Sequence, residues 1–84
     1  MAILATNIDS VFDVIRKLRE SNFEITDIFF DKSCDYFSIK IIRNESVVKI
    51  IHCRGVLFIM STFQKPVFAN KVLIFDDLSY EEIK

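Results

Sequence analysis

Residues 36–53, YFSIKIIRNESVVKIIHC, decide the fold, because two runs of β-branched and aromatic residues flank the dipeptide Asn44-Glu45. Runs of this composition favour β-strands, and a two-residue connection between them is typical of an antiparallel hairpin. We therefore expect strands over residues 35–43 and 46–53.

The alternation of side chains along this hairpin predicts its register. If Arg43 pairs with Ser46, one face is almost entirely apolar and the other is mixed, whereas a slip of one residue would scramble both faces. The apolar face then pairs Ile41 with Val48, Ile39 with Ile50 and Phe37 with His52. The mixed face pairs Ile42 with Val47, Lys40 with Lys49, Ser38 with Ile51 and Tyr36 with Cys53.

Before the hairpin, residues 8–21 have the apolar spacing of an amphipathic helix. Thr6 followed by Asp9 resembles a capping box at its start. The apolar side chains that define the helix face are Ile8, Val11, Phe12, Ile15 and Leu18. We expect this face to cover the apolar face of the hairpin.

The remaining apolar runs predict further strands over residues 23–30, 56–62 and 71–75, with Arg54-Gly55 as a turn. Ser79 with Glu82 has capping-box spacing and predicts a short C-terminal helical turn. Whether residues 2–5 add an edge strand is left open. The expected fold is α+β, with an N-terminal helix packed on a mostly antiparallel sheet of four or five strands.

Composition limits the class of protein. A chain of 84 residues, 51% of them hydrophobic, suits a single folded domain over residues 1–84. The only glycine and proline, Gly55 and Pro66, exclude a glycine-rich phosphate loop. The absence of a long apolar run and of a signal-like start indicates a soluble, cytoplasmic protein that does not interact with membranes. Cys34 and Cys53 are then expected to be reduced and to pack as small hydrophobic residues.

The sequence contains no recognisable catalytic, cofactor-binding or metal-binding constellation, so we expect no cofactor and no enzymatic activity. His52 and Cys53 are neighbours on a strand and point to opposite sides, so they cannot act on one metal ion or one substrate. We expect His52 at the edge of the core or on the surface. The acidic pairs Asp76-Asp77 and Glu81-Glu82 have the character of a solvated edge.

The width of the sheet gives the main functional expectation. A helix over residues 8–21 would be about 21 Å long and about 10 Å wide, whereas four or five strands make a sheet roughly 19 to 24 Å wide. Because soluble monomers seldom expose large contiguous apolar patches, we expect a homo-oligomer, in the simplest case a homodimer, or a complex with another protein. The interaction-face candidates are Tyr36, Lys40, Ile42, Val47, Lys49, Ile51, Phe58 and Met60.

The distribution of charge supports an alternative. The charged residues between positions 20 and 35 are mostly acidic, and those between positions 36 and 71 are mostly basic, although the formal net charge of the chain is only −1. The repulsion between Lys40 and Lys49, which lie opposite each other, should be relieved by an anion, an acidic partner or a splayed geometry of the two side chains. With Tyr36, Arg43 and Phe58 they form a basic and aromatic surface of the kind that binds single-stranded nucleic acid, although the acidic composition disfavours this function.

Overall fold

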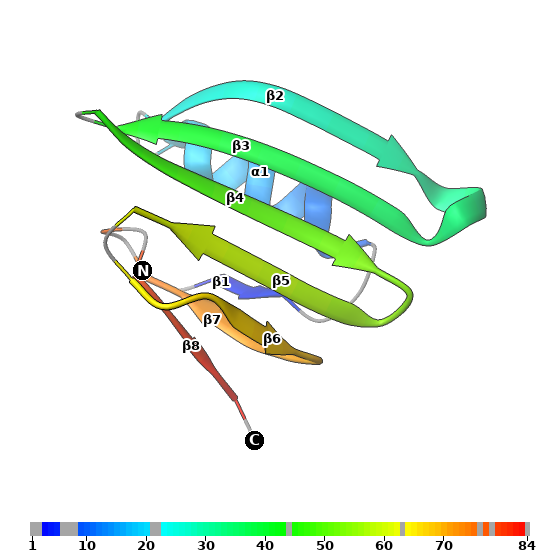
Figure 1. Ribbon diagram of the computed structural model, residues 1–84. Helices are drawn as coiled ribbons and strands as arrows, with labels where there is room; N and C mark the ends of the chain where they lie inside the picture. The colour runs from blue at the N-terminus through cyan, green and yellow to red at the C-terminus, as the bar shows by residue number, and fades with distance from the viewer. Residues whose placement is uncertain are drawn as a thin grey trace.

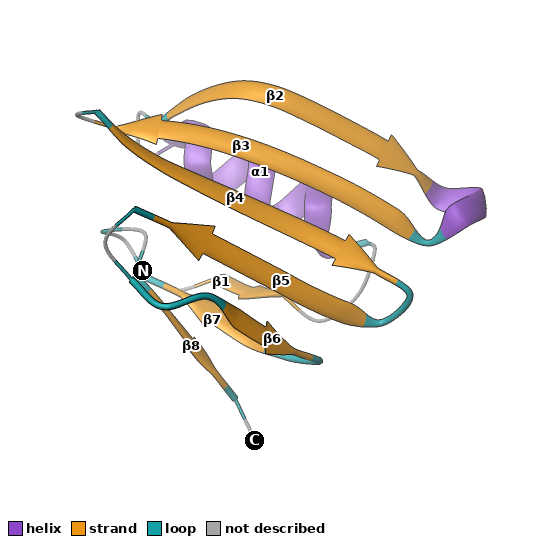
Figure 2. Ribbon diagram, viewed as in Figure 1, coloured by secondary structure: helices purple, strands orange, loops and turns teal. Residues whose placement is uncertain are grey.

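The computed structural model describes residues 3–5, 9–20, 23–43, 45–62, 64–75, 77 and 79–83. It has two layers, with a five-stranded antiparallel sheet in front and one helix beside a three-stranded sheet behind it (Figures 1 and 2). The elements are β1 (Ile3–Ala5), α1 (Ser10–Glu20), β2 (Glu24–Asp31), the short 3-10 helix η1 (Lys32–Cys34), β3 (Tyr36–Arg43), β4 (Ser46–Cys53), β5 (Val56–Ser61), β6 (Val67–Ala69), β7 (Val72–Ile74) and β8 (Tyr80–Glu82).

The large sheet has the strand order β2-β3-β4-β5-β6, so each strand pairs with the next one along the chain. The predicted hairpin register is confirmed in all of its pairs, from Arg43 with Ser46 to Tyr36 with Cys53. At the next turn, Arg54 and Gly55 have φ angles of 49° and 82°. Two positive φ angles are the mark of the turn that matches strand twist in a two-residue hairpin, and glycine adopts such an angle without steric cost.

The second layer covers the inner face of the large sheet. In Figure 1, α1 lies behind β3 and β4, whereas in the small sheet, ordered β1-β7-β8, β1 and β7 lie behind β5 and β6 and β8 extends below them. Val14 and Leu18 of α1, Val72 and Ile74 of β7 and Tyr80 of β8 are buried in one core cluster. From the large sheet the inner side chains that are buried are Phe37, Ile39, Ile41, Val48, Ile50, His52, Leu57, Ile59 and Ala69.

Two expectations about the ends of the described chain are corrected or resolved. The prediction of a C-terminal helical turn is wrong, because residues 80–82 form β8 and pair with β7. Tyr80 is buried, and the side-chain amide of Gln64 donates to its carbonyl and accepts from its N–H, which fixes an extended backbone. At the other end, residues 3–5 do form a strand, β1, which pairs with β7 in the small sheet.

The helix and the last predicted strand also differ in detail from the expectation. Helix α1 covers Ser10–Glu20, and Thr6 of the expected capping box lies outside the described residues. The strand expected over residues 71–75 is β7, which belongs to the small sheet and not to the large one. The helix alone could not cover the large sheet, and this small sheet supplies the missing cover for its inner face.

Candidate functional site

The candidate site is the outer face of the large sheet, which neither α1 nor the small sheet covers (Figure 1). Strand pairing arranges its side chains in rows that run across the strands, and three of these rows lie beside a fourth that consists of Glu24, Ile42 and Val47. The central row is Phe29, Ser38, Ile51, Phe58 and Phe68. The lysine row is Asp27, Lys40, Lys49 and Met60, and the tyrosine row is Asp31, Tyr36, Cys53 and Val56.

The eight residues predicted from the sequence all lie on this outer face. Their strands are β3 for Tyr36, Lys40 and Ile42, β4 for Val47, Lys49 and Ile51, and β5 for Phe58 and Met60. Lys49 and Met60 are exposed, and the other six are half-buried by their neighbours in the sheet. The structure therefore brings together every residue of the predicted face.

Two aromatic residues of the same face were missing from the predicted set. Phe29 lies in a strand whose position was predicted but whose register was not, and a β-bulge between Ile25 and Asp27 interrupts its alternation. Phe68 lies in β6, which has only three residues and follows Pro66 closely. The pairing of Phe68 with Phe58 could have been predicted only by extending the strand register from β5 across the break at residues 62–66.

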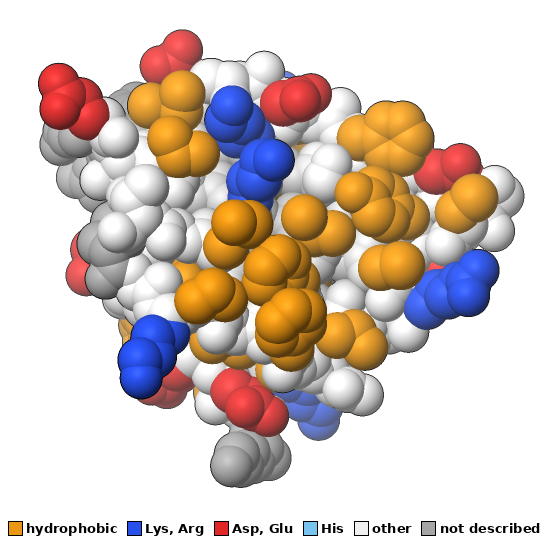
Figure 3. Space-filling view, viewed as in Figure 1, with side chains coloured by type: hydrophobic (Ala, Val, Ile, Leu, Met, Phe, Trp, Pro, Cys, Tyr) orange, Lys and Arg blue, Asp and Glu red, His pale blue; other side chains and the backbone are white. Residues whose placement is uncertain are grey.

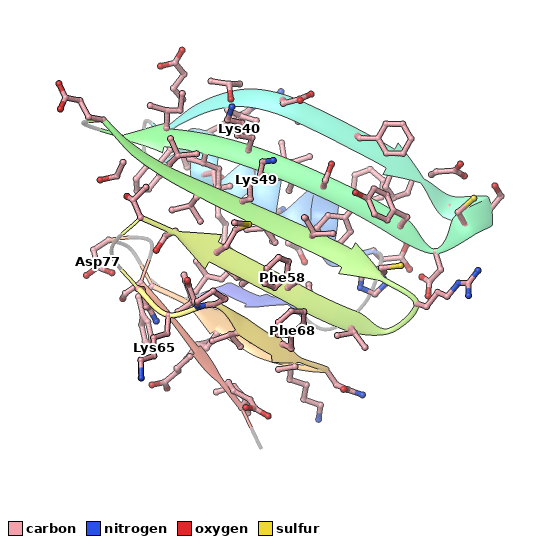
Figure 4. The ribbon with its side chains drawn as sticks, viewed as in Figure 1. Lys40, Lys49, Phe58, Lys65, Phe68 and Asp77 are labelled. Carbon is pink, nitrogen blue, oxygen red and sulfur yellow. The ribbon has the colours of Figure 1, made fainter. Side chains whose placement is uncertain are left out.

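These aromatic side chains make the ends of the central row strongly apolar. Phe58 and Phe68 stack with ring centroids 4.3 Å apart and 15° between the ring planes, and they lie side by side in Figure 4. At the other end, Phe29 meets Tyr36 edge to face, with centroids 5.7 Å apart. Phe68 is 69% exposed and Phe29 is 55% exposed, so both rings present most of their surface to water. The resulting patch is the hydrophobic area at the centre of Figure 3.

The lysine row borders this patch on one side. Lys40 and Lys49 are direct cross-strand partners, and Asp27 is the partner of Lys40 on the other side (Figure 4). The three charged residues help to line a hollow of about 110 Å³. The aspartate next to the two lysines offsets part of their mutual repulsion, which leaves about one positive charge beside the apolar rows.

The tyrosine row borders a wider pocket of about 380 Å³, which is lined by Phe29, Tyr36, Asp31, Arg54 and the two cysteines. Cys34 and Cys53 are both free and exposed, so the expectation that they pack as buried hydrophobic residues is wrong. Cys34 is the last residue of η1, and Cys53 points to the outer side of β4, which α1 and the small sheet leave uncovered.

Asp31 caps η1 and is expected to make stability at this end of the sheet depend on pH. Its carboxylate accepts hydrogen bonds from the Ser33 hydroxyl at 2.6 Å and the Ser33 N–H at 3.0 Å. The Ser33 hydroxyl bond, followed by one from Cys34, holds the pKa of Asp31 below its ordinary value of 3.8. A lowered pKa means that the stabilisation is present above the ordinary value and is lost as the pH falls through the lowered value.

The Asp31→Ala variant should therefore melt at a lower temperature than the parent near neutral pH, and the difference should shrink as the pH falls below 3.8. Thermal unfolding followed by circular dichroism over a pH series measures both effects. A difference in melting temperature that stays constant down to strongly acidic pH would show that the charged carboxylate is not what stabilises the turn.

His52 is a core residue, and its surroundings differ from those of a catalytic base. Its ring stacks on Phe37 with centroids 5.4 Å apart and only 5° between the planes. Nε2 lies 3.1 Å from the Asp35 carboxylate, whereas Nδ1 is buried and has no hydrogen-bond partner among the described residues. Cys53 points to the opposite side of the sheet, as predicted. A histidine enclosed in this way can orient Asp35 but has no open side for a substrate.

Metal-ion and membrane features can be stated for the described part of the chain. Among these residues, no three histidine, cysteine, aspartate or glutamate side chains are grouped so that they could hold a metal ion. Of the acidic pairs, Asp77, Glu81 and Glu82 are exposed, and Asp76 lies outside the described residues. No described helix has the length and apolar character needed to span a bilayer. In comparisons with known proteins, the chain matched no protein-family model, no curated protein and no solved structure.

Proposed function

We propose that this protein is a non-enzymatic interaction module whose outer face packs against a second copy of the chain. The observation that supports the proposal is the central row, which crosses all five strands of the large sheet, is apolar at four of its five positions and is exposed at both ends. Four strand spacings of about 4.8 Å make this row roughly 19 Å wide. An apolar row of that width on an uncovered sheet is typical of a surface that binds protein.

The arrangement of the rows favours a symmetric partner. A two-fold axis along the central row would stack that row on itself, with the two sheets about 10 Å apart as in β-sandwiches. The lysine row of one copy would then lie over the tyrosine row of the other, where Tyr36 and Asp31 offer an aromatic face and a carboxylate. A two-fold axis parallel to the strands would instead place the lysine row of one copy over the lysine row of the other. Because like charges repel, we expect the first arrangement.

Phe68 is the residue whose replacement best tests this interface. Because its ring is 69% exposed, Phe68→Ser should cost the isolated chain only the stacking on Phe58, about 0.5–1.5 kcal/mol. An aromatic residue that packs in an interface contributes about 2 kcal/mol, and because both copies lose the ring, dimerisation should weaken at least roughly 30-fold. Light scattering over a concentration series measures the mass of the parent and variant directly.

A matched control is Phe12→Ser, which removes another phenylalanine that is more than half exposed, from α1 on the other side of the large sheet. This variant should associate as the parent does. A parent that stays at 9.8 kDa at every concentration would contradict self-association, and equal weakening by both variants would contradict the assignment to the outer face.

The lysine pair supports a second candidate function, the binding of single-stranded nucleic acid. The relevant residues are those singled out in the sequence, namely Tyr36, Lys40, Arg43, Lys49 and Phe58. Two contacts favour protein over nucleic acid as the partner: Phe58 already stacks on Phe68, and Asp27 lies beside Lys40. Steeply salt-dependent binding of a labelled oligonucleotide that is lost in the Lys40→Glu, Lys49→Glu double variant would favour the nucleic-acid function instead.

A further inference from the structure

The two edges of the large sheet differ in how well they are protected. At one edge, β6 has only three residues and follows Pro66, and short strands and prolines are devices that prevent pairing with other chains. At the other edge, β2 has eight residues and contains no proline and no lysine. Strand β2 lies at the margin of the sheet in Figure 1, and among the described strands only β3 is hydrogen-bonded to it. Its outward N–H and C=O groups are therefore open to another strand.

Apolar side chains flank this open edge on both faces of the sheet. On the inner side, Ile28 and Phe30 are exposed, and Phe30 touches Phe12 of α1 with ring centroids 5.3 Å apart. Phe12 is itself 60% exposed, so α1 presents an apolar ring at the margin of β2. On the outer side, Phe29 is more than half exposed. A strand added at β2 would bury apolar surface on both of its own faces.

The charges on β2 all have the same sign and lie on one side. Glu24, Asp27 and Asp31 pair with residues of the outer face of β3, and no basic residue lies within β2. Acidic side chains accordingly appear along this margin in Figure 3. A cross-strand neighbour of opposite charge stabilises a sheet, whereas one of like charge destabilises it.

From these features we infer that β2 accepts an extended segment of a different protein as a sixth strand of the large sheet. Its sequence should alternate, with lysine or arginine on the outer side near Asp27 and apolar residues on the inner side near Ile28, Phe30 and Phe12. Backbone hydrogen bonds to β2 would supply affinity, and the alternating side chains would supply specificity. A second copy does not fit this edge, because two β2 strands would bring acidic residues together.

This binding site lies at the β2 edge of the large sheet, at the opposite end of the central row from Phe68, and binding there does not depend on the proposed dimer. A fluorescently labelled, acetylated and amidated peptide that alternates lysine with valine is a suitable probe. Fluorescence anisotropy should show binding that weakens between about 0.1 and about 1 M salt, as the Debye length falls from about 10 to about 3 Å. In nuclear magnetic resonance spectra, the amide signals that shift should be those of β2.

Variants of the protein should separate the apolar contribution to peptide binding from the contribution of charge. Phe12→Ser should weaken peptide binding roughly tenfold by removing apolar cover, and the Glu24→Gln, Asp27→Asn double variant should weaken it roughly fivefold. Phe68→Ser, on the outer face, should leave peptide binding unchanged. Because all four positions are exposed, these variants should keep the circular dichroism spectrum of the parent.

Three control results would overturn the inference. A peptide with glutamate in place of lysine should not bind, and equal binding would remove the charge specificity. A lysine peptide N-methylated at alternate residues should lose binding, and retained binding would show that no strand is added. Protection of β2 amides from hydrogen exchange that rises with protein concentration, without peptide, would show that a second copy occupies the edge.

Discussion

Replacing Phe37 by alanine should lower the free energy of unfolding by about 3–5 kcal/mol, the usual cost of truncating a fully buried phenylalanine. Phe37 has no exposed surface, and it lies on the inner face of β3 at the centre of the core cluster. Its ring also stacks on His52, so the substitution leaves a cavity and removes the apolar cover from a buried polar ring. Both effects act in the same direction.

The expected loss is a large fraction of the total stability. A domain of 84 residues is stable by roughly 4–13 kcal/mol, so Phe37→Ala should unfold at much lower urea concentration or be unfolded without denaturant. Urea titration followed by circular dichroism gives the difference. The matched control is Phe29→Ala on the exposed side of β2, which should cost less than about 1 kcal/mol. Equal costs for the two variants would contradict the assignment of the inner and outer faces.

Tyr80→Ala should be destabilising to a similar extent, by about 3–5 kcal/mol. Tyr80 is the buried residue of β8, and its hydroxyl donates to the Lys65 carbonyl at 3.1 Å. The ring belongs to the core cluster together with Val72 and Ile74 of β7. Its removal should therefore loosen the small sheet from the large one.

A second variant separates the contribution of the Tyr80 ring to stability from that of its hydroxyl. Tyr80→Phe keeps the apolar volume and loses only the hydrogen bond, so it should cost about 0.5–1.5 kcal/mol. Hydrogen exchange should then show that Tyr80→Ala exposes the amides of β7 before those of β3 and β4. If Tyr80→Phe proves as costly as Tyr80→Ala, the hydroxyl bond and not the burial of the ring would hold β8 in place.

The hairpin of β3 and β4 could be predicted pair by pair for a physical reason. Each strand has eight residues, and a two-residue connection leaves only one register that keeps Phe37, Ile39 and Ile41 on one side. The assignment of the candidate residues to the outer face of the sheet followed from the same alternation of side chains. The sequence therefore predicted most of the candidate site as a surface, without indicating what binds to it.

The small sheet could not be predicted in the same way. Strands β1, β7 and β8 have three residues each, which is too short for alternation to distinguish a strand from a helical turn. Ser79 with Glu82 fits a capping box, but Gln64, distant in the sequence, bonds both backbone groups of Tyr80 and holds an extended chain. Tertiary contacts of this kind leave no local signal. The same limitation hid Phe68, whose strand is equally short.

The pairing of β1 with β7 affects how the chain can fold during synthesis. Each strand of the large sheet pairs with its successor, so its hairpins close short loops, whereas Ile3 in β1 pairs with Ile74 in β7 and closes almost the whole described chain. Loops of that length form late, because closing them costs more entropy. Leu57 and Ile59 are made before β7, and they stay uncovered until β7 has paired with β1 behind them. The chain therefore passes through an interval in which these side chains of its future core are open to aggregation or to a chaperone.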